Sequence, residues 1–117
     1  MNIVSCAVAI FMFWSASCAG TVCAESDLVS RGRNFAELVC SACHVVSTNK
    51  SDVPILRNPG PSFAAIAART STTDATLRAY LVTTHPDMGP TGRMPNPRLV
   101  DYEIDEVIAY ILNLREH

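Results

Sequence analysis

Cys40-Ser41-Ala42-Cys43-His44 is the stretch on which the fold of this chain depends. Two cysteines separated by two residues and followed at once by histidine are typical of sites where haem is attached covalently. Thiols at this spacing, at a helix end, can reach the two vinyl groups on one porphyrin edge as thioethers, and the adjacent imidazole then lies over the ring and binds the iron. The motif therefore predicts one haem c, attached through Cys40 and Cys43, with His44 as an axial iron ligand.

Three other uses of this motif compete with haem attachment. A thioredoxin-like dithiol needs its cysteines at the start of a helix in a βαβ unit, whereas here they end a helix with no strand pattern nearby. A zinc site needs a fourth ligand besides Cys40, Cys43 and His44; His85 or His117 could supply it, but neither has finger-like spacing. A disulfide between the two cysteines would close a very small, strained loop. Haem attachment is the favoured interpretation.

Residues 1–24 contain no charged side chain, and their first half is almost continuously apolar from Ile3 to Trp14. This profile predicts a secretory signal peptide, with cleavage after Ala24 preferred and cleavage after Ala19 as the alternative. We therefore expect a single periplasmic domain over residues 25–117. No Lys or Arg precedes the apolar run, so an uncleaved membrane anchor is an alternative to a signal peptide. The run from Ile3 to Trp14 is, however, short for a spanning helix, which needs about 20 apolar residues.

Signal cleavage also simplifies the cysteine content. Of the five cysteines, Cys6, Cys18 and Cys23 would leave with the signal, so that only Cys40 and Cys43 remain. A disulfide framework joining distant parts of the chain is then impossible. The formal net charge of −2 gives no sign of a nucleic-acid partner or of binding to an anionic membrane.

Hydrophobic periodicity predicts an all-α domain, because no segment alternates with period two. Four helices are expected, over Ser26 to Ser41, Ser62 to Arg69, Thr73 to Thr84, and Asp101 to Arg115. Their inward-facing residues are predicted to be Leu28, Gly32, Phe35, Ala36 and Val39 in the first, Phe63, Ile66 and Ala67 in the second, Leu77, Tyr80 and Leu81 in the third, and Ile104, Val107, Ile108, Ile111 and Leu112 in the last. Gly32 weakens its helix by about 1 kcal/mol relative to alanine, and it is either a tolerated glycine or the point of close approach by another helix.

The segment before the last helix is a candidate source of the second iron ligand. Residues 86–98 hold four prolines and two glycines, which rules out a helix or strand. Met94, followed by Pro95, is the preferred sixth ligand, and Met88 and His85 are the alternatives. An iron with two strong axial ligands exchanges electrons with little rearrangement.

Four stretches together carry a family resemblance: Gly32 to His44, Gly60-Pro61-Ser62-Phe63, Arg93-Met94-Pro95-Asn96, and Glu103 to Ile111. In order and spacing they resemble class I (mitochondrial-type) bacterial cytochromes c. The resemblance implies three to five helices around one haem, with the N- and C-terminal helices crossing at Gly32 and Tyr110.

The resemblance also implies residues that would hold the cofactor. A proline carbonyl is expected to accept a hydrogen bond from the His44 imidazole, with Pro59 or Pro61 as the candidate. Arg57 is either a haem propionate partner or a solvated charge, and Tyr80 either a second propionate partner or a core residue. The chain departs from the family's lysine-rich docking face, since Lys50 is its only lysine.

These observations favour a periplasmic one-electron carrier, not an enzyme, that works as a monomer with redox protein partners. A haem enzyme or gas sensor with a displaceable distal ligand is the main alternative. A dedicated cytochrome subunit of a periplasmic oxidoreductase is another.

Overall fold

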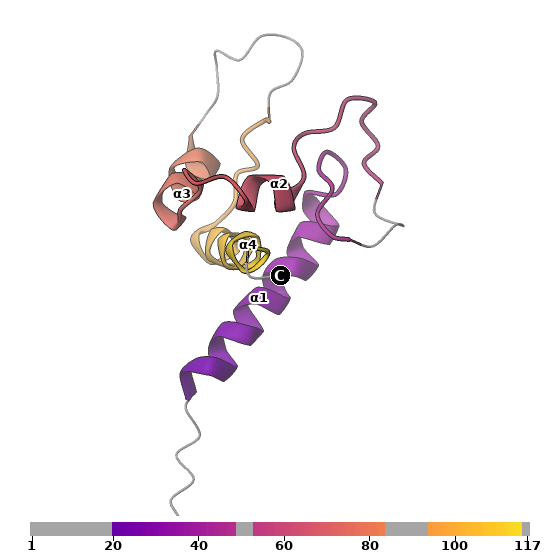
Figure 1. The fold of residues 1–117 in the computed structure, drawn as a ribbon. Coiled ribbons are helices and arrows are strands. Elements are labelled where there is room, and N and C mark those ends of the chain that lie inside the picture. The colour runs from indigo at the N-terminus through magenta and orange to yellow at the C-terminus, as the bar shows by residue number, and fades with distance from the viewer. Residues whose placement is uncertain (1–19, 49–52, 84–93, 116–117) are drawn as a thin grey trace, which may run out of the picture.

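The computed structural model describes residues 20–48, 53–83 and 94–115. Its regular structure consists of α1 (Gly20–Val39), α2 (Phe63–Ala67), α3 (Asp74–Val82) and α4 (Asp101–Asn113). Figure 1 shows α2 and α3 grouped near α4, with α1 running across the domain. No strand occurs among the described residues, and four helices lie within the expected three to five, so the all-α prediction is confirmed. In the part of the chain described, no helix is both long and apolar enough to cross a membrane.

The main helix–helix interface lies between α1 and α4. In Figure 1, α4 is seen almost along its axis while α1 runs across the view, so the two helices cross steeply. Gly32 is at the crossing: a Cβ atom added there would lie 1.9 Å from the carbonyl oxygen of Glu106 and 2.9 Å from Cβ of Tyr110. Beside it, Arg31 Nε donates to Glu106 Oε1 at 2.8 Å. The predicted crossing at Gly32 and Tyr110 is confirmed.

A single hydrophobic core joins the four helices and the segment after the CxxCH motif. Its buried members are Ala36, Val46, Phe63, Ala67, Leu81, Ile104, Val107, Ile108, Tyr110 and Ile111. The predicted inward faces of α2 and α4 are thus confirmed. Two assignments were wrong: Val39 is 49% exposed at the last turn of α1, and Tyr80 is 41% exposed on α3. Helical spacing alone does not fix how wide the buried stripe of a helix is.

The start of α1 also differs from the prediction. The helix begins at Gly20 instead of at Ser26, and so continues through the residues around Ala24. Residues 20–25 contain no proline, and nothing in their sequence forces a helix to stop. A serine is therefore not enough to set a helix start when the preceding residues can also be helical.

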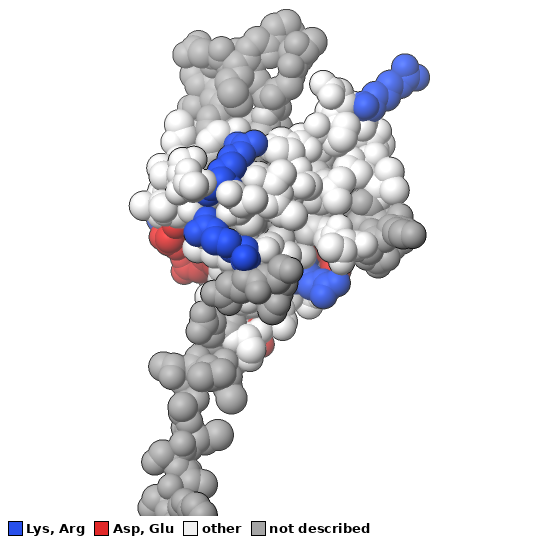
Figure 2. All heavy atoms as spheres, viewed as in Figure 1, with Lys and Arg blue, Asp and Glu red and all other residues white. Residues whose placement is uncertain are grey.

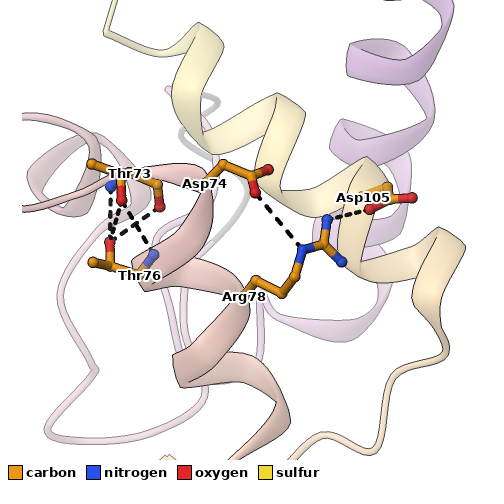
Figure 3. Close-up of polar contacts among 5 residues, drawn as sticks. All are labelled: Thr73, Asp74, Thr76, Arg78 and Asp105. Carbon is orange, nitrogen blue, oxygen red and sulfur yellow. Dashed lines mark hydrogen bonds and ion pairs between the residues drawn. The ribbon is translucent and has the colours of Figure 1, made fainter.

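Two groups of polar contacts hold α3 in place (Figure 3). At its N-terminus, Thr73 caps the helix as predicted: the Thr73 hydroxyl accepts from the Thr76 N–H at 3.2 Å, and the Thr76 hydroxyl accepts from the Thr73 N–H at 2.8 Å. On its outer surface, the Arg78 guanidinium lies between two carboxylates, Asp74 of the same helix and Asp105 of α4. The ion pairs raise the pKa of Arg78 and tie α3 to α4.

The end of α4 is held by Arg115. Its guanidinium donates to the carbonyl oxygen of Ala67 at 2.9 Å and to that of Thr72 at 2.6 Å. The side chain thus satisfies carbonyl groups at the end of α2 and in the turn before α3, so that one residue joins three elements.

Candidate haem site

The CxxCH motif lies in the turn that ends α1. Cys40 N–H still donates to the carbonyl of Ala36 at 2.9 Å, as in a helix. The N–H groups of Cys43 and His44 then both turn back to the carbonyl of Cys40, at 3.1 and 2.9 Å. Both thiols are free and partly buried. The turn therefore presents Cys40, Cys43 and His44 together at one helix end, as the motif requires for attachment to one porphyrin edge.

The Cys40 thiol is in an environment that keeps it neutral. Burial, and secondarily the neighbouring Cys43, raise the pKa of the Cys40 thiol from 9.0 to about 11. A thiol with a raised pKa is a poor nucleophile near neutral pH. This argues against a redox-active dithiol, which needs a thiolate of lowered pKa.

His44 is 8% exposed, and its imidazole is oriented by the main chain. Its Nδ1 lies 2.8 Å from the carbonyl oxygen of Pro61. Because a carbonyl can only accept, the ring proton is on Nδ1, and Nε2 keeps its lone pair for a metal. Of the two prolines that the sequence left open, the structure thus places Pro61, and not Pro59, against the imidazole.

Gly60 lies directly against the same imidazole. A Cβ atom at Gly60 would be 2.5 Å from Cε1 and 2.8 Å from Nδ1 of His44. Its N–H donates to the Cys43 carbonyl at 2.8 Å, which fastens this segment to the motif. Gly60 is a site residue that was not predicted from the sequence. The sequence signal for Gly60 was its position between two prolines, but such a pattern is equally typical of an ordinary turn.

A third set of contacts holds the segment that follows His44. The Tyr110 hydroxyl donates to the buried carbonyl of Val46 at 2.8 Å, and the Phe63 N–H donates to the Val45 carbonyl at 2.9 Å. The Phe63 ring lies 5.7 Å from the His44 ring and 6.3 Å from the Tyr110 ring, between centroids. α2 and α4 therefore both fix the chain next to the histidine.

Met94 begins the described stretch that leads into α4. It is partly buried and packs against the core. Two residues on, the Asn96 side-chain oxygen accepts from the Arg98 N–H at 2.8 Å, in a turn where Arg98 has a φ of 53°. The alternatives for the sixth ligand, Met88 and His85, lie outside the described residues.

The other two predicted site residues are on the surface. Arg57 is exposed in the loop before Pro59, and Tyr80 is on α3. The contacts known for the described residues do not join either of them to Cys40, Cys43 or His44. Whether they serve haem propionates stays a prediction.

The donor groups present fit a haem better than a free metal ion. Among the described residues, no three His, Cys, Asp or Glu side chains converge to hold a metal ion. His85 and His117, the fourth ligands considered for zinc, lie outside the described residues. A haem needs only two cysteine thiols, an oriented histidine and one further ligand. The motif turn presents the two thiols, and the Nδ1–carbonyl hydrogen bond and the glycine packed on the imidazole orient the histidine. The further ligand stays the prediction made for Met94.

Comparison with known proteins shows the family of the chain. The family model described as cytochrome c matches residues 29–115. A similar protein is cytochrome c-552 of Bradyrhizobium diazoefficiens, which is 31% identical over 84 residues, or 72% of each chain. No solved structure matches at a significant level.

Proposed function

Because the chain belongs to the cytochrome c family, whose haem c it carries through Cys40 and Cys43, we propose that it is a periplasmic one-electron carrier with His44 and Met94 as axial ligands. Members of this family are electron-transfer proteins. The bound haem supplies the Fe(III)/Fe(II) couple. The residues of the chain must then hold the iron's ligands in place and keep water from the site.

The observation that carries the proposal is the arrangement around His44. The imidazole is buried, its Nδ1 proton is held by the Pro61 carbonyl, and Gly60 packs on the ring. A hydrogen bond at Nδ1 fixes the tautomer and makes Nε2 a stronger donor to a metal. A ligand fixed in this way moves little when the iron changes charge, which suits electron transfer.

Met94 is proposed as the opposite ligand because of its position and its neighbours. It lies in the proline-rich segment just before α4, and it is already packed against the core. A thioether favours Fe(II) and raises the reduction potential of a haem. For the haem propionates we propose Arg57 and Tyr80, since a guanidinium and a phenol hydroxyl are the donors that carboxylates accept from.

The ligand assignment is tested by optical spectra and carbon monoxide binding. The holoprotein should show the methionine–iron charge-transfer band in its oxidised form and should not bind carbon monoxide readily when reduced. Met94→Ala should remove the band and open the ferrous iron to carbon monoxide, whereas the control Met88→Ala should do neither. If Met88→Ala has these effects and Met94→Ala does not, the assignment is overturned.

Export is tested separately. The haem-containing protein should be recovered from the periplasmic fraction. Its mass should be that of residues 25–117 with one haem attached. A mass that retains these residues, in the membrane fraction, would instead show that the N-terminal segment serves as an anchor.

A further inference from the structure

The five-residue helix α2 lies between the histidine and the end of α4. A helix of this length is not stable by itself, so contacts at its two ends must set its position. Its buried residues, Phe63 and Ala67, lie one turn apart on the same face of the helix. α2 packs on α4, beside which it lies in Figure 1. A displacement of one end of this short helix is therefore passed on to the other end.

The N-terminal end of α2 holds His44. The Pro61 carbonyl oxygen, two residues before the helix, lies 2.8 Å from Nδ1 of His44. The Phe63 N–H donates to the Val45 carbonyl at 2.9 Å, and the Phe63 ring lies 5.7 Å from the imidazole, between centroids. Because N–H···O hydrogen bonds weaken beyond about 3.2 Å, a shift of α2 by a few tenths of an ångström would weaken the bond to the imidazole.

The C-terminal end of α2 is held by Arg115. Its Nε donates to the carbonyl oxygen of Ala67 at 2.9 Å, and its Nη2 donates to that of Thr72 at 2.6 Å. The Thr72 hydroxyl in turn donates to the carbonyl oxygen of Ile66 at 2.7 Å. Ala67 is fully buried and Thr72 is 6% exposed, so water has little access to these residues. Arg115 therefore fastens α2 and the turn that follows it to the end of α4.

We propose that Arg115 is a positioning residue for the iron ligand His44. By holding the C-terminal end of α2, it keeps the Pro61 carbonyl on the Nδ1 proton of the imidazole. The inference rests on the proposed function, in which Nε2 of His44 binds the haem iron. A hydrogen bond at Nδ1 makes the imidazole a stronger donor, which favours Fe(III) over Fe(II) and lowers the reduction potential. Arg115 thus lowers the potential through α2.

Loss of the guanidinium has two effects of opposite sign on the potential. Removal of a positive charge favours Fe(III) and lowers the potential, whereas release of the imidazole from the Pro61 carbonyl favours Fe(II) and raises it. The charge effect needs its own control, because the chain has nine Lys and Arg residues and Figure 2 shows few of them on the face it presents. Arg69→Met supplies this control, since Arg69 is an exposed arginine just after α2.

The experiment compares Arg115→Met with Arg69→Met in the holoprotein. The first readout is the rate at which the His44 Nδ1 proton exchanges with water, followed by NMR of the reduced protein, with the amide proton of Ile108 in α4 as a reference for general loosening. Arg115→Met should speed exchange of the Nδ1 proton on the order of tenfold relative to that of Ile108, and it should raise the potential. Arg69→Met should leave the exchange rate unchanged and the potential unchanged or slightly lower.

Arg115→Lys is a second, milder variant. It keeps the charge and one donor group, but it lacks the planar fork that reaches two carbonyl groups. Its Nδ1 exchange rate and its potential should lie between those of the unmodified protein and those of Arg115→Met. This variant carries the test if Arg115→Met yields too little folded holoprotein.

Three results would overturn the proposal. The Nδ1 proton could exchange at the unmodified rate in both Arg115 variants, its exchange could speed up no more than that of the Ile108 amide, or the potential of Arg115→Met could fall as in Arg69→Met. Failure of the proposed function looks different. In that case the unmodified protein itself carries no covalent haem, or its His44 ring protons lack the NMR shifts that a haem causes in its axial ligand.

Discussion

Gly32→Ala probes the crossing of α1 and α4 most directly. The added Cβ would lie 1.9 Å from the Glu106 carbonyl oxygen and 2.6 Å from its carbonyl carbon, whereas non-bonded atoms attract at about 3.5 Å or more. The obstacle is main chain, which cannot rotate away as a side chain can. The two helices must therefore move apart by roughly 1.5 Å at this point.

The free-energy effect combines two opposing terms. Alanine favours the helix by about 1 kcal/mol relative to glycine. Overpacking costs about 1–3 kcal/mol, and the upper end applies here because separation also stretches the hydrogen bond from Arg31 to Glu106, whose side chain is 13% exposed. We expect a net loss of about 2 kcal/mol, or a fall in Tm of roughly 10 °C for a domain of this size.

The measurement is urea unfolding of the holoprotein, followed by far-UV circular dichroism and by the Soret band. Ser30→Ala is the matched control: it lies on the same helix, is exposed, and loses only a hydrogen bond within the helix, to the Ser26 carbonyl. The control should shift the free energy of unfolding by less than about 0.5 kcal/mol. If Gly32→Ala is as stable as the unmodified protein, the helices do not meet closely at Gly32 and the reasoning is refuted.

Three further predictions follow from the site. Tyr110→Phe leaves the buried Val46 carbonyl without its phenol donor and should lower the free energy of unfolding by about 1–2 kcal/mol in the same urea assay; no change would mean that water replaces the donor. Gly60→Ala should displace the His44 ring and alter the reduction potential and the spectrum of the haem, and unchanged values would show that the glycine has no positioning role. In the folded haem-free chain, the raised pKa of Cys40 means that its thiolate forms only as the pH rises from 9 towards 11, so iodoacetamide should modify it about 100-fold more slowly at pH 8 than an ordinary thiol. For the same reason, stability is retained below pH 9 and falls as the pH rises through 11; alkylation with an apparent pKa of 9 or below would contradict the burial of Cys40.

Much of the fold could be predicted from the sequence because its signals are local. The cap at Thr73 and the start of α4 at Asp101 agree with the structure, since capping and periodicity act within one or two turns. The start of α1 could not be predicted in the same way, because serine at Ser26 competes with residues that are equally able to be helical. Tyr80 has core spacing but lies at the edge of the buried stripe, which only the packing of α3 against α4 decides.

In the site, too, local sequence signals could be predicted, whereas contacts between distant residues could not. The motif identified Cys40 and His44, because their chemistry depends on sequence spacing. Gly60 and the hydrogen bond from Tyr110 to Val46 could not be found in this way, since they join residues far apart in the chain. Their role is visible only when the loop after the motif has folded back onto the imidazole.

The described residues hold the two sides of the proposed haem with unequal firmness. On the His44 side, the Pro61 carbonyl and the backbone of Gly60 fix the imidazole, and both belong to a segment bonded to the motif. On the other side, the stretch from Met94 to α4 is held by a hydrogen bond in the turn at Arg98, where a positive φ disfavours a residue with a side chain, and by the bonds of Val100 to the first turn of α4. Arg98→Gly should therefore ease that turn and change the methionine–iron band or the reduction potential while the free energy of unfolding stays within about 1 kcal/mol. A variant that loses stability by several kcal/mol with an unchanged spectrum would show that this turn serves the core and not the ligand.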